Sequence, residues 1–129
     1  MKNLLWFDHK NYTSLEIIKY KSISNKKIIK SIKINDKTII DFIIDEIRKI
    51  PSNGDAMIKF GPNAEKIDLI FSGDEGIQTI YIYEKQFKTP STGFNSNNNI
   101  EKVIYEYINK ILYPNLINKV KKLFKNNIN

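Results

Sequence analysis

The sequence predicts a single α+β domain spanning residues 1–129, built on a mostly antiparallel sheet of about five to six strands. One amphipathic helix is inserted in mid-chain, and two helices follow at the C-terminal end. Three observations support this. The length of 129 residues fits one domain. Short turns join most strand-like segments, which favours hairpins. The apolar spacing changes from two to three or four in a few segments, which is typical of helices packed on a sheet.

The first half of the chain contains three strand-like segments and one helix-like segment. The strands are expected at residues 4–7, 13–23 and 26–35, with a hairpin turn at Ser24-Asn25 between the last two. The helix is expected over residues 36–50. Its apolar stripe is made of Ile39, Ile40, Ile43, Ile47 and Ile50. Asn35 or Asp36 can cap its start, and Pro51 follows its end.

Three more strands are expected at residues 55–61, 65–72 and 76–87. Turns at 61–64 and 72–76 are short, so the three strands should form an antiparallel meander. In the last strand, Ile80 and Ile82 point to one face, whereas Thr79, Tyr81 and Tyr83 point to the other. This strand is therefore either central in the sheet or exposes a row of tyrosines.

The C-terminal region has the pattern of two helices. The first, over residues 100–112, is expected to bury Ile100, Val103, Ile104, Tyr107, Ile108 and Ile111. Asn98 and Glu101 have the spacing of a capping box at its start, and Pro114 interrupts it. The second, over residues 115–124, has an apolar stripe of Leu116, Ile117, Val120, Leu123 and Phe124.

The composition excludes several kinds of chemistry. The chain has no cysteine, which rules out disulfides, thiolate nucleophiles and cysteine-based metal sites. It has one histidine, His9, so a site with two histidine ligands is impossible. We therefore predict a protein that is not an enzyme and has no catalytic residues, cofactor or metal. No apolar run approaches the ~18 residues of a membrane span, so we expect a cytoplasmic protein without a membrane partner.

The charge is distributed unevenly along the chain. Its net value is +7, from 20 Lys and one Arg against 14 acidic residues. Residues 1–37 carry a net charge of +6, residues 38–87 one of −4, and residues 88–129 one of +5. Such asymmetry can steer a charged macromolecular partner. The asymmetry is also compatible with chance on a solvated surface, and the abundance of Lys, Ile and Asn suggests a gene rich in A and T codons.

The segment KTPSTGF, from Lys88 to Phe94, lies between the last expected strand and an asparagine-rich loop. It lacks the glycines and the spacing of a phosphate-binding loop. A loop with one aromatic side chain and several hydroxyls suits a protein contact, with Lys88 and Phe94 as contact residues. In the alternative, Phe94 folds back over the core.

A nucleic-acid-binding protein remains an alternative. Tyr81 and Tyr83 have the two-residue spacing of a stacking platform on a sheet, although the surrounding residues lack the glycines of RNA-binding motifs. The last expected helix carries Lys119, Lys121, Lys122 and Lys125. Such a basic helix can bind phosphates, or it can simply expose its lysines to water.

The run from Phe60 to Phe94, FGPNAEKIDLIFSGDEGIQTIYIYEKQFKTPSTGF, with the asparagine-rich loop and two helices after it, resembles the immunity proteins of bacterial contact-dependent growth inhibition and related polymorphic toxin systems. The resemblance lies in size, composition and hairpin organisation. It implies a protein that binds one cognate toxin domain, often a nuclease, and blocks its active site or a site that the toxin needs.

The residues suggest how such a partner would be bound. Our hypothesis is that acidic side chains from the middle of the chain meet a basic toxin surface, while Tyr81 or Phe94 supplies buried contact area. The acidic residues are Asp41, Asp45, Asp68, Asp74, Glu75 and Glu84.

Overall fold

The computed structural model describes residues 11–50, 60–88 and 99–114. This part of the chain forms an α+β fold, as predicted. Its elements, in chain order, are β1 (Ser14–Tyr20), β2 (Ile28–Ile34), α1 (Lys37–Arg48), β3 (Lys66–Gly73), β4 (Gly76–Tyr83), β5 (Gln86–Lys88) and α2 (Asn99–Leu112). The five strands form one antiparallel sheet in the order β2-β1-β3-β4-β5. The strand expected at 4–7, most of that at 55–61 and the helix at 115–124 lie outside the described residues.

The core lies on one face of the sheet because the inward positions of neighbouring strands coincide in register. Leu69 in β3 lies opposite Ile17 in β1 and Ile80 in β4. All three side chains are fully buried. Because successive side chains in a strand alternate between faces, each strand contributes only every second residue to this layer. Burying one aliphatic side chain of this kind stabilises a fold by roughly 1.5–3 kcal/mol.

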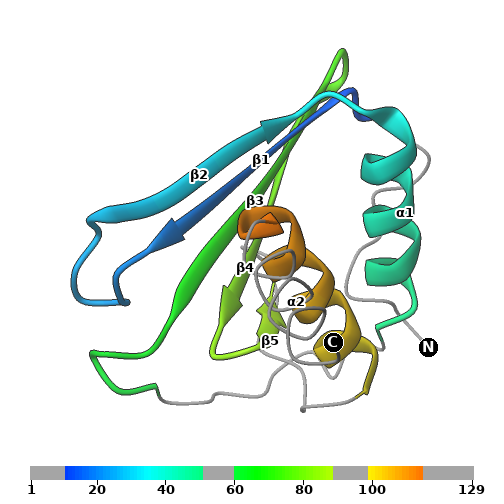
Figure 1. The fold of residues 1–129 in the computed structure, drawn as a ribbon. Coiled ribbons are helices and arrows are strands. Elements are labelled where there is room, and N and C mark those ends of the chain that lie inside the picture. Colours follow the sequence, from blue (N-terminus) through cyan, green and yellow to red (C-terminus); the bar gives the residue numbers. More distant parts are fainter. Residues whose placement is uncertain (1–10, 51–59, 89–98, 115–129) are drawn as a thin grey trace, which may run out of the picture.

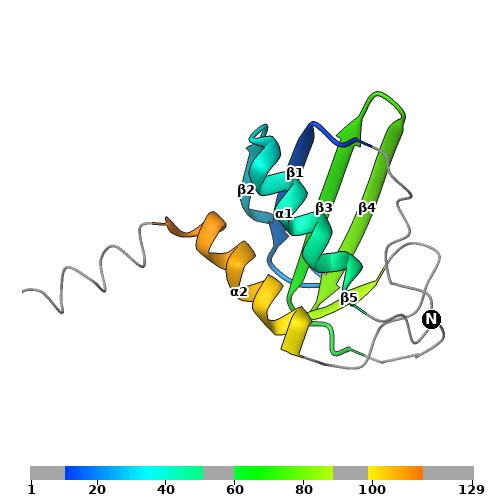
Figure 2. The ribbon, with the colours of Figure 1, turned by 90° about the vertical axis from the view of Figure 1, so that its right-hand side faces the viewer.

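Both helices pack on that same apolar face, as Figures 1 and 2 show. The backbone N–H of Thr38 donates a hydrogen bond of 2.9 Å to Asp36, which caps the start of α1 as predicted. The residues that α1 buries are Ile40, Ile43, Ile44 and Ile47. In α2, Ile104, Ile108 and Leu112 complete the core. The two described helices therefore cover the same face of the sheet.

The strand expected over residues 76–87 is two strands, and this prediction was wrong. The chain turns at Glu84 and Lys85, whose φ angles are 48° and 72°. β5 then pairs back on β4, with Phe87 opposite Ile82. Two consecutive residues with positive φ match the right-handed twist of a tight hairpin. The sequence gives no sign of this turn because neither residue is the Gly, Asn or Asp that usually adopts positive φ.

Val103 is 56% exposed, although the apolar pattern of its helix predicted that it would be buried. The core-facing stripe of α2 runs through Ile104, Ile108 and Leu112, and Val103 lies to one side of it. There it lines a hollow between α1 and α2 together with Phe42, which is 44% exposed. Tyr107 is half-buried beside Phe42, with ring centroids 4.9 Å apart.

The predicted turns lie within the observed connections, although the connection between β1 and β2 spans residues 21–27 and is longer than the predicted turn at Ser24-Asn25. The backbone N–H of Ser22 donates to the carbonyl of Asn25, which closes the turn between β1 and β2. Asp74 and Glu75 form the two-residue connection between β3 and β4. The N–H of Ala64 donates to the carbonyl of Gly61 in the loop before β3. The glycine, proline, asparagine and serine residues in these segments explain why the sequence alone located them.

Candidate functional site

The sheet face opposite the helices carries a group of aromatic and charged side chains. We call Tyr20, Phe60, Lys66, Asp68, Tyr81 and Tyr83 the open-face cluster. Tyr20 of β1 lies opposite Lys66 of β3, and Lys66 lies opposite Tyr83 of β4. Two residues further along β3, Asp68 lies opposite Tyr81. Strand register therefore brings together side chains from residues 20 to 83.

Three aromatic rings of the cluster, those of Phe60, Tyr81 and Tyr83, form a connected layer. The ring centroids of Tyr81 and Tyr83 are 6.3 Å apart, with an interplanar angle of 30°. Phe60, from the loop before β3, meets Tyr83 edge to face with a centroid distance of 5.9 Å. Tyr20, Tyr81 and Tyr83 are half-buried, so part of each side chain is exposed at the surface. Half-exposed tyrosines on a rigid sheet supply contact area at a low cost in side-chain entropy.

Lys66 and Asp68 form an ion pair in the middle of this layer. The Lys66 Nζ lies 3.2 Å from Asp68 Oδ1 and 3.3 Å from Asp68 Oδ2. The same Nζ lies 4.3 Å from the ring centroid of Tyr20 and 5.7 Å from that of Tyr81. The lysine is thus held by one carboxylate and by the faces of two aromatic rings, both of which attract a cation.

The tyrosines are affected by burial and by this carboxylate. Burial is the largest cause that raises the pKa of Tyr20, and the negative charge of Asp68 is the next. The same two causes raise the pKa of Tyr83. Both hydroxyls therefore stay protonated at physiological pH, and a hydrogen bond of the Tyr20 hydroxyl with Asp68 raises its pKa further.

Three residues predicted from the sequence meet on this face. Asp68, Tyr81 and Lys88 lie opposite one another across β3, β4 and β5. The sequence analysis missed Tyr20, Phe60 and Lys66. The two-residue periodicity of β1 and β3 could have placed Tyr20 and Lys66 on one face, but only the pairing of β1 with β3 makes them neighbours.

The other predicted contact residues lie elsewhere. Asp74 and Glu75 are exposed at the turn that precedes β4, whereas Glu84 is exposed at the turn that follows it, so the full length of β4 separates them. Asp41 and Asp45 are on α1, on the helix side of the sheet, where they pair with Lys37 at 3.1 Å and Arg48 at 4.0 Å. Phe94 lies outside the described residues. The acidic residues of the middle segment are thus distributed over several surfaces.

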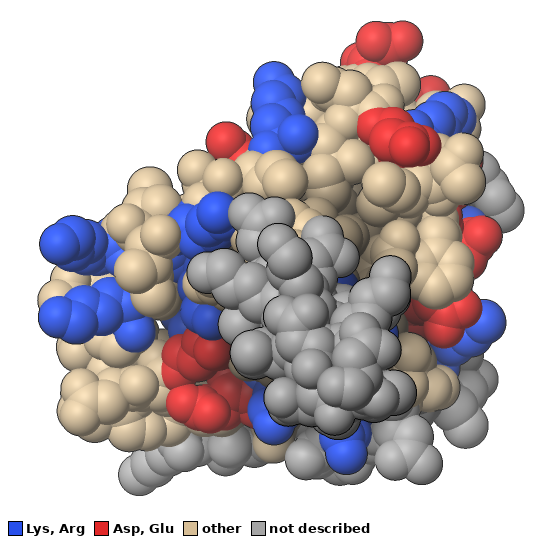
Figure 3. All heavy atoms as spheres, in the orientation of Figure 1, with Lys and Arg blue, Asp and Glu red and all other residues tan. Residues whose placement is uncertain are grey.

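Basic residues gather on the β1–β2 hairpin. Residues 19–33 contain six lysines and no acidic residue: Lys19, Lys21, Lys26, Lys27, Lys30 and Lys33. Figure 3 shows blue side chains at the left, over the β1–β2 hairpin, and a red tip at the top, where the β3–β4 turn lies. Within the described sheet β2 is an edge strand, and lysines on an edge discourage pairing with other chains.

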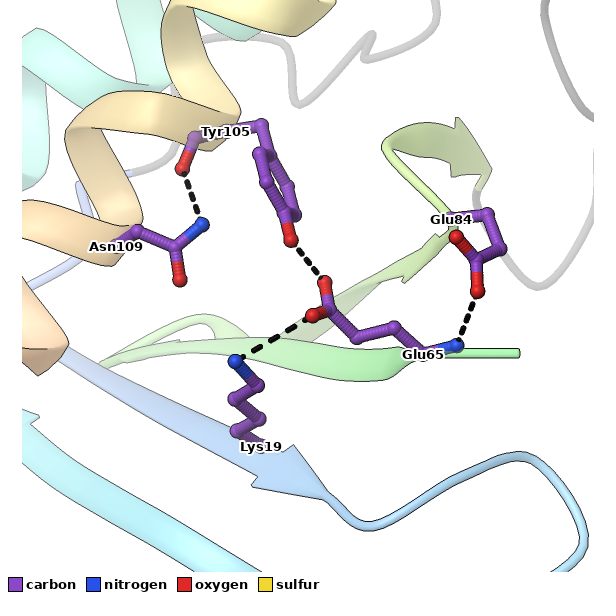
Figure 4. Close-up of polar contacts among 5 residues, drawn as sticks. All are labelled: Lys19, Glu65, Glu84, Tyr105 and Asn109. Carbon is purple, nitrogen blue, oxygen red and sulfur yellow. Dashed lines mark hydrogen bonds and ion pairs between the residues drawn. The ribbon is translucent and has the colours of Figure 1, made fainter. Parts of the chain in front are cut away.

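A second polar group links α2 to the sheet on the helix side (Figure 4). The Tyr105 hydroxyl donates a hydrogen bond to Glu65 Oε1, and Lys19 Nζ lies 3.3 Å from Glu65 Oε2. The Glu65 backbone N–H donates to the Glu84 carboxylate at 2.7 Å. Burial, followed by the hydrogen bond to Glu65, raises the pKa of Tyr105 to about 12. These contacts join β1, the loop before β3, the β4–β5 turn and α2.

We expect Tyr105→Phe to lower the free energy of unfolding by about 1–2 kcal/mol, because it removes a donor from a half-buried carboxylate. Urea denaturation measures this change. Tyr107→Phe is the matched control, since Tyr107 is on the same helix and is also half-buried, and we expect it to change stability by less than about 0.5 kcal/mol. Equal losses in the two variants would contradict a stabilising role for the Glu65 contact.

No known protein family, curated protein or solved structure shows detectable similarity to this chain. In residues 11–50, 60–88 and 99–114, no helix is both long and apolar enough to cross a membrane. Within the same ranges, no group of three or more His, Asp or Glu side chains is arranged to hold a metal ion. The candidate site therefore has to be judged on its own geometry and chemistry.

Proposed function

We propose that the protein is a non-catalytic binding module that neutralises a cognate toxin domain in the cytoplasm, in the manner of the immunity proteins it resembles. The observation that supports this best is the open-face cluster, a tyrosine-rich layer on a rigid sheet face that neither described helix covers. Tyrosine is enriched at protein interfaces because its ring supplies buried area and its hydroxyl supplies a hydrogen bond. The partner would be a toxin domain such as a nuclease, blocked by occupation of its active site or of a surface that it needs.

The test is a pull-down from nuclease-treated host lysate that contains the product of the gene immediately upstream. We expect one protein, retained in equimolar amount at low and at high salt. Tyr81→Ala should weaken its binding at least tenfold, because a central interface tyrosine commonly contributes more than ~1.4 kcal/mol. Ile77→Ala is the matched control. Ile77 is on the same strand and is 72% exposed, but it pairs with Ser72 at the far end of the sheet.

Charge reversal at Asp74 and Glu75, tested in the same pull-down, shows whether the acidic β3–β4 turn contributes to binding in addition to the open-face cluster. Lost binding in the double variant Asp74→Lys/Glu75→Lys would add the β3–β4 turn to the interface. Unchanged binding would exclude that turn from the acidic contact surface. Unchanged binding in both this variant and Tyr81→Ala would contradict the proposed interface altogether.

A nucleic-acid partner is the second candidate, and the lysine-rich β1–β2 hairpin is the observation that favours it. Binding through phosphates releases counterions, so affinity would fall steeply with added salt. Recovery of nucleic acid alone, lost at high salt, would favour this alternative over the toxin-binding function. The ion pair of Lys66 with Asp68 argues against the open face as its site, because the carboxylate repels phosphate.

A further inference from the structure

In the Lys66–Asp68 ion pair, one oxygen of the carboxylate accepts no hydrogen bond from the described residues. Asp68 Oδ1 is buried, and among the described residues no group donates a hydrogen bond to it. Lys66 Nζ lies 3.2 Å from this oxygen but donates its hydrogen bond to Oδ2, and the Tyr20 hydroxyl interacts with the same carboxylate. The Asp68 side chain is only 10% exposed. The ammonium supplies charge to Oδ1 but no aligned N–H, so this oxygen can still accept a hydrogen bond from a better-aligned donor.

The surroundings of this oxygen select the kind of donor. The Tyr20 and Tyr81 rings flank the position of the Lys66 ammonium, and their faces attract positive charge. A carboxylate whose bound cation also contacts two aromatic rings is complementary to a cation that offers several N–H groups. Arginine fits best, since its planar guanidinium can stack on a ring while it donates in the plane to a carboxylate.

We propose that the open-face cluster is a binding site for an arginine side chain of the protein partner, seated between Tyr20 and Tyr81 and donating to Asp68. This inference rests on the proposed protein-binding function and names the chemistry of the contact. In the free protein Lys66 occupies the site as an internal cation. When the arginine enters, the Lys66 ammonium moves into water on its flexible stem, because two positive charges held close together against one buried carboxylate repel each other.

This arrangement predicts the sign of a mutational effect. If Lys66 competes with the incoming cation, its removal strengthens binding. If instead Lys66 is itself a partner contact, its removal weakens binding. Asp68→Asn keeps the shape of the side chain but removes the negative charge, so it should abolish cation binding in either case.

The probe is N-acetyl-arginine amide, titrated into the full chain while the ring resonances of Tyr20 and Tyr81 are followed by NMR. N-acetyl-citrulline amide is the matched control, since it has nearly the same shape without the charge. We expect the arginine derivative to shift both rings, the citrulline derivative to shift neither, and Lys66→Met to bind the arginine derivative about tenfold more tightly. Asp68→Asn should show no binding.

Weaker binding to Lys66→Met, or equal shifts with the citrulline derivative, would overturn the proposal. Shifts with adenosine monophosphate in place of the arginine derivative would also overturn it and would point to nucleobase stacking. Lys66→Met leaves a buried carboxylate without its cation, which lowers the stability of that variant. The comparison of the wild type with the isosteric Asp68→Asn therefore tests the proposal independently of Lys66→Met. A partner recovered in the pull-down without any effect of the arginine probe would refute this inference and leave the proposed function intact.

Discussion

Replacing Glu101 with glutamine should stabilise the protein at neutral pH by up to ~3 kcal/mol and remove much of its pH dependence. Glu101 is fully buried in the first turn of α2, and its Oε2 accepts a hydrogen bond of 2.9 Å from the Phe87 N–H of β5. Burial raises the pKa of Glu101 from 4.5 to about 7, while the Phe87 hydrogen bond opposes this. The folded protein therefore keeps a proton on this carboxyl that the unfolded chain releases.

The direction of the effect follows from proton binding. Between pH 4.5 and about 7 the folded state holds this proton and the unfolded state does not. The contribution of Glu101 is therefore most favourable below pH 4.5 and is lost as the pH rises through about 7. Glutamine is neutral at every pH and can still accept a hydrogen bond from the Phe87 N–H. It therefore keeps the uncharged, hydrogen-bonded side chain that Glu101 has at low pH.

Urea denaturation at several pH values between 4.5 and 8 measures this difference. Wild type and Glu101→Gln should agree near pH 4.5 and diverge toward pH 8, with the variant more stable. Glu106→Gln is the control, because Glu106 is on the same helix but exposed. Parallel stability curves for wild type and Glu101→Gln would show that Glu101 does not carry the pH dependence.

Gly73→Ala should destabilise the protein by about 2–3 kcal/mol. A Cβ at position 73 would overlap the carbonyl oxygen of Asn11, and it would lie 3.3 Å from the Tyr12 Cα. The neighbouring chain cannot move away freely, because the Thr13 N–H is bonded to the Ser72 carbonyl at 2.9 Å and the Tyr12 side chain is buried. The glycine is therefore required by close backbone contact.

Thermal and urea unfolding measure this loss, and Gly61→Ala provides the comparison. A Cβ at position 61 would have no atom within 4 Å, and an alanine there reduces the entropy of the unfolded chain, so stability should stay the same or rise slightly. Similar unfolding midpoints for the Gly73→Ala variant and wild type would mean that the segment at Asn11 adjusts easily to the added methyl group.

Part of the candidate site was visible in the sequence. Tyr81 and Tyr83 share a face because strand side chains alternate, and the sequence predicted that face correctly for both. Asp68 was also predicted as a contact residue, but on account of its charge alone. Its pairing with Lys66 is local, since the two residues are two positions apart on the same face of β3. The contacts of this pair with Tyr20 and Tyr81 depend on which strands are neighbours, and no local pattern encodes them.

The sequence by itself determined the α+β class, both described helices and the turns rich in glycine, proline, asparagine and serine. These features depend on local periodicity, capping and backbone preference, and each can be read within about 15 residues. The tertiary structure alone decided that residues 76–88 turn back at Glu84 and Lys85, that Glu101 is buried against β5, and that Tyr20, Lys66, Asp68 and Tyr81 form one cluster. The reason is physical: strand order and register arise from packing between distant segments, and they overrule local preference where burial gains more free energy.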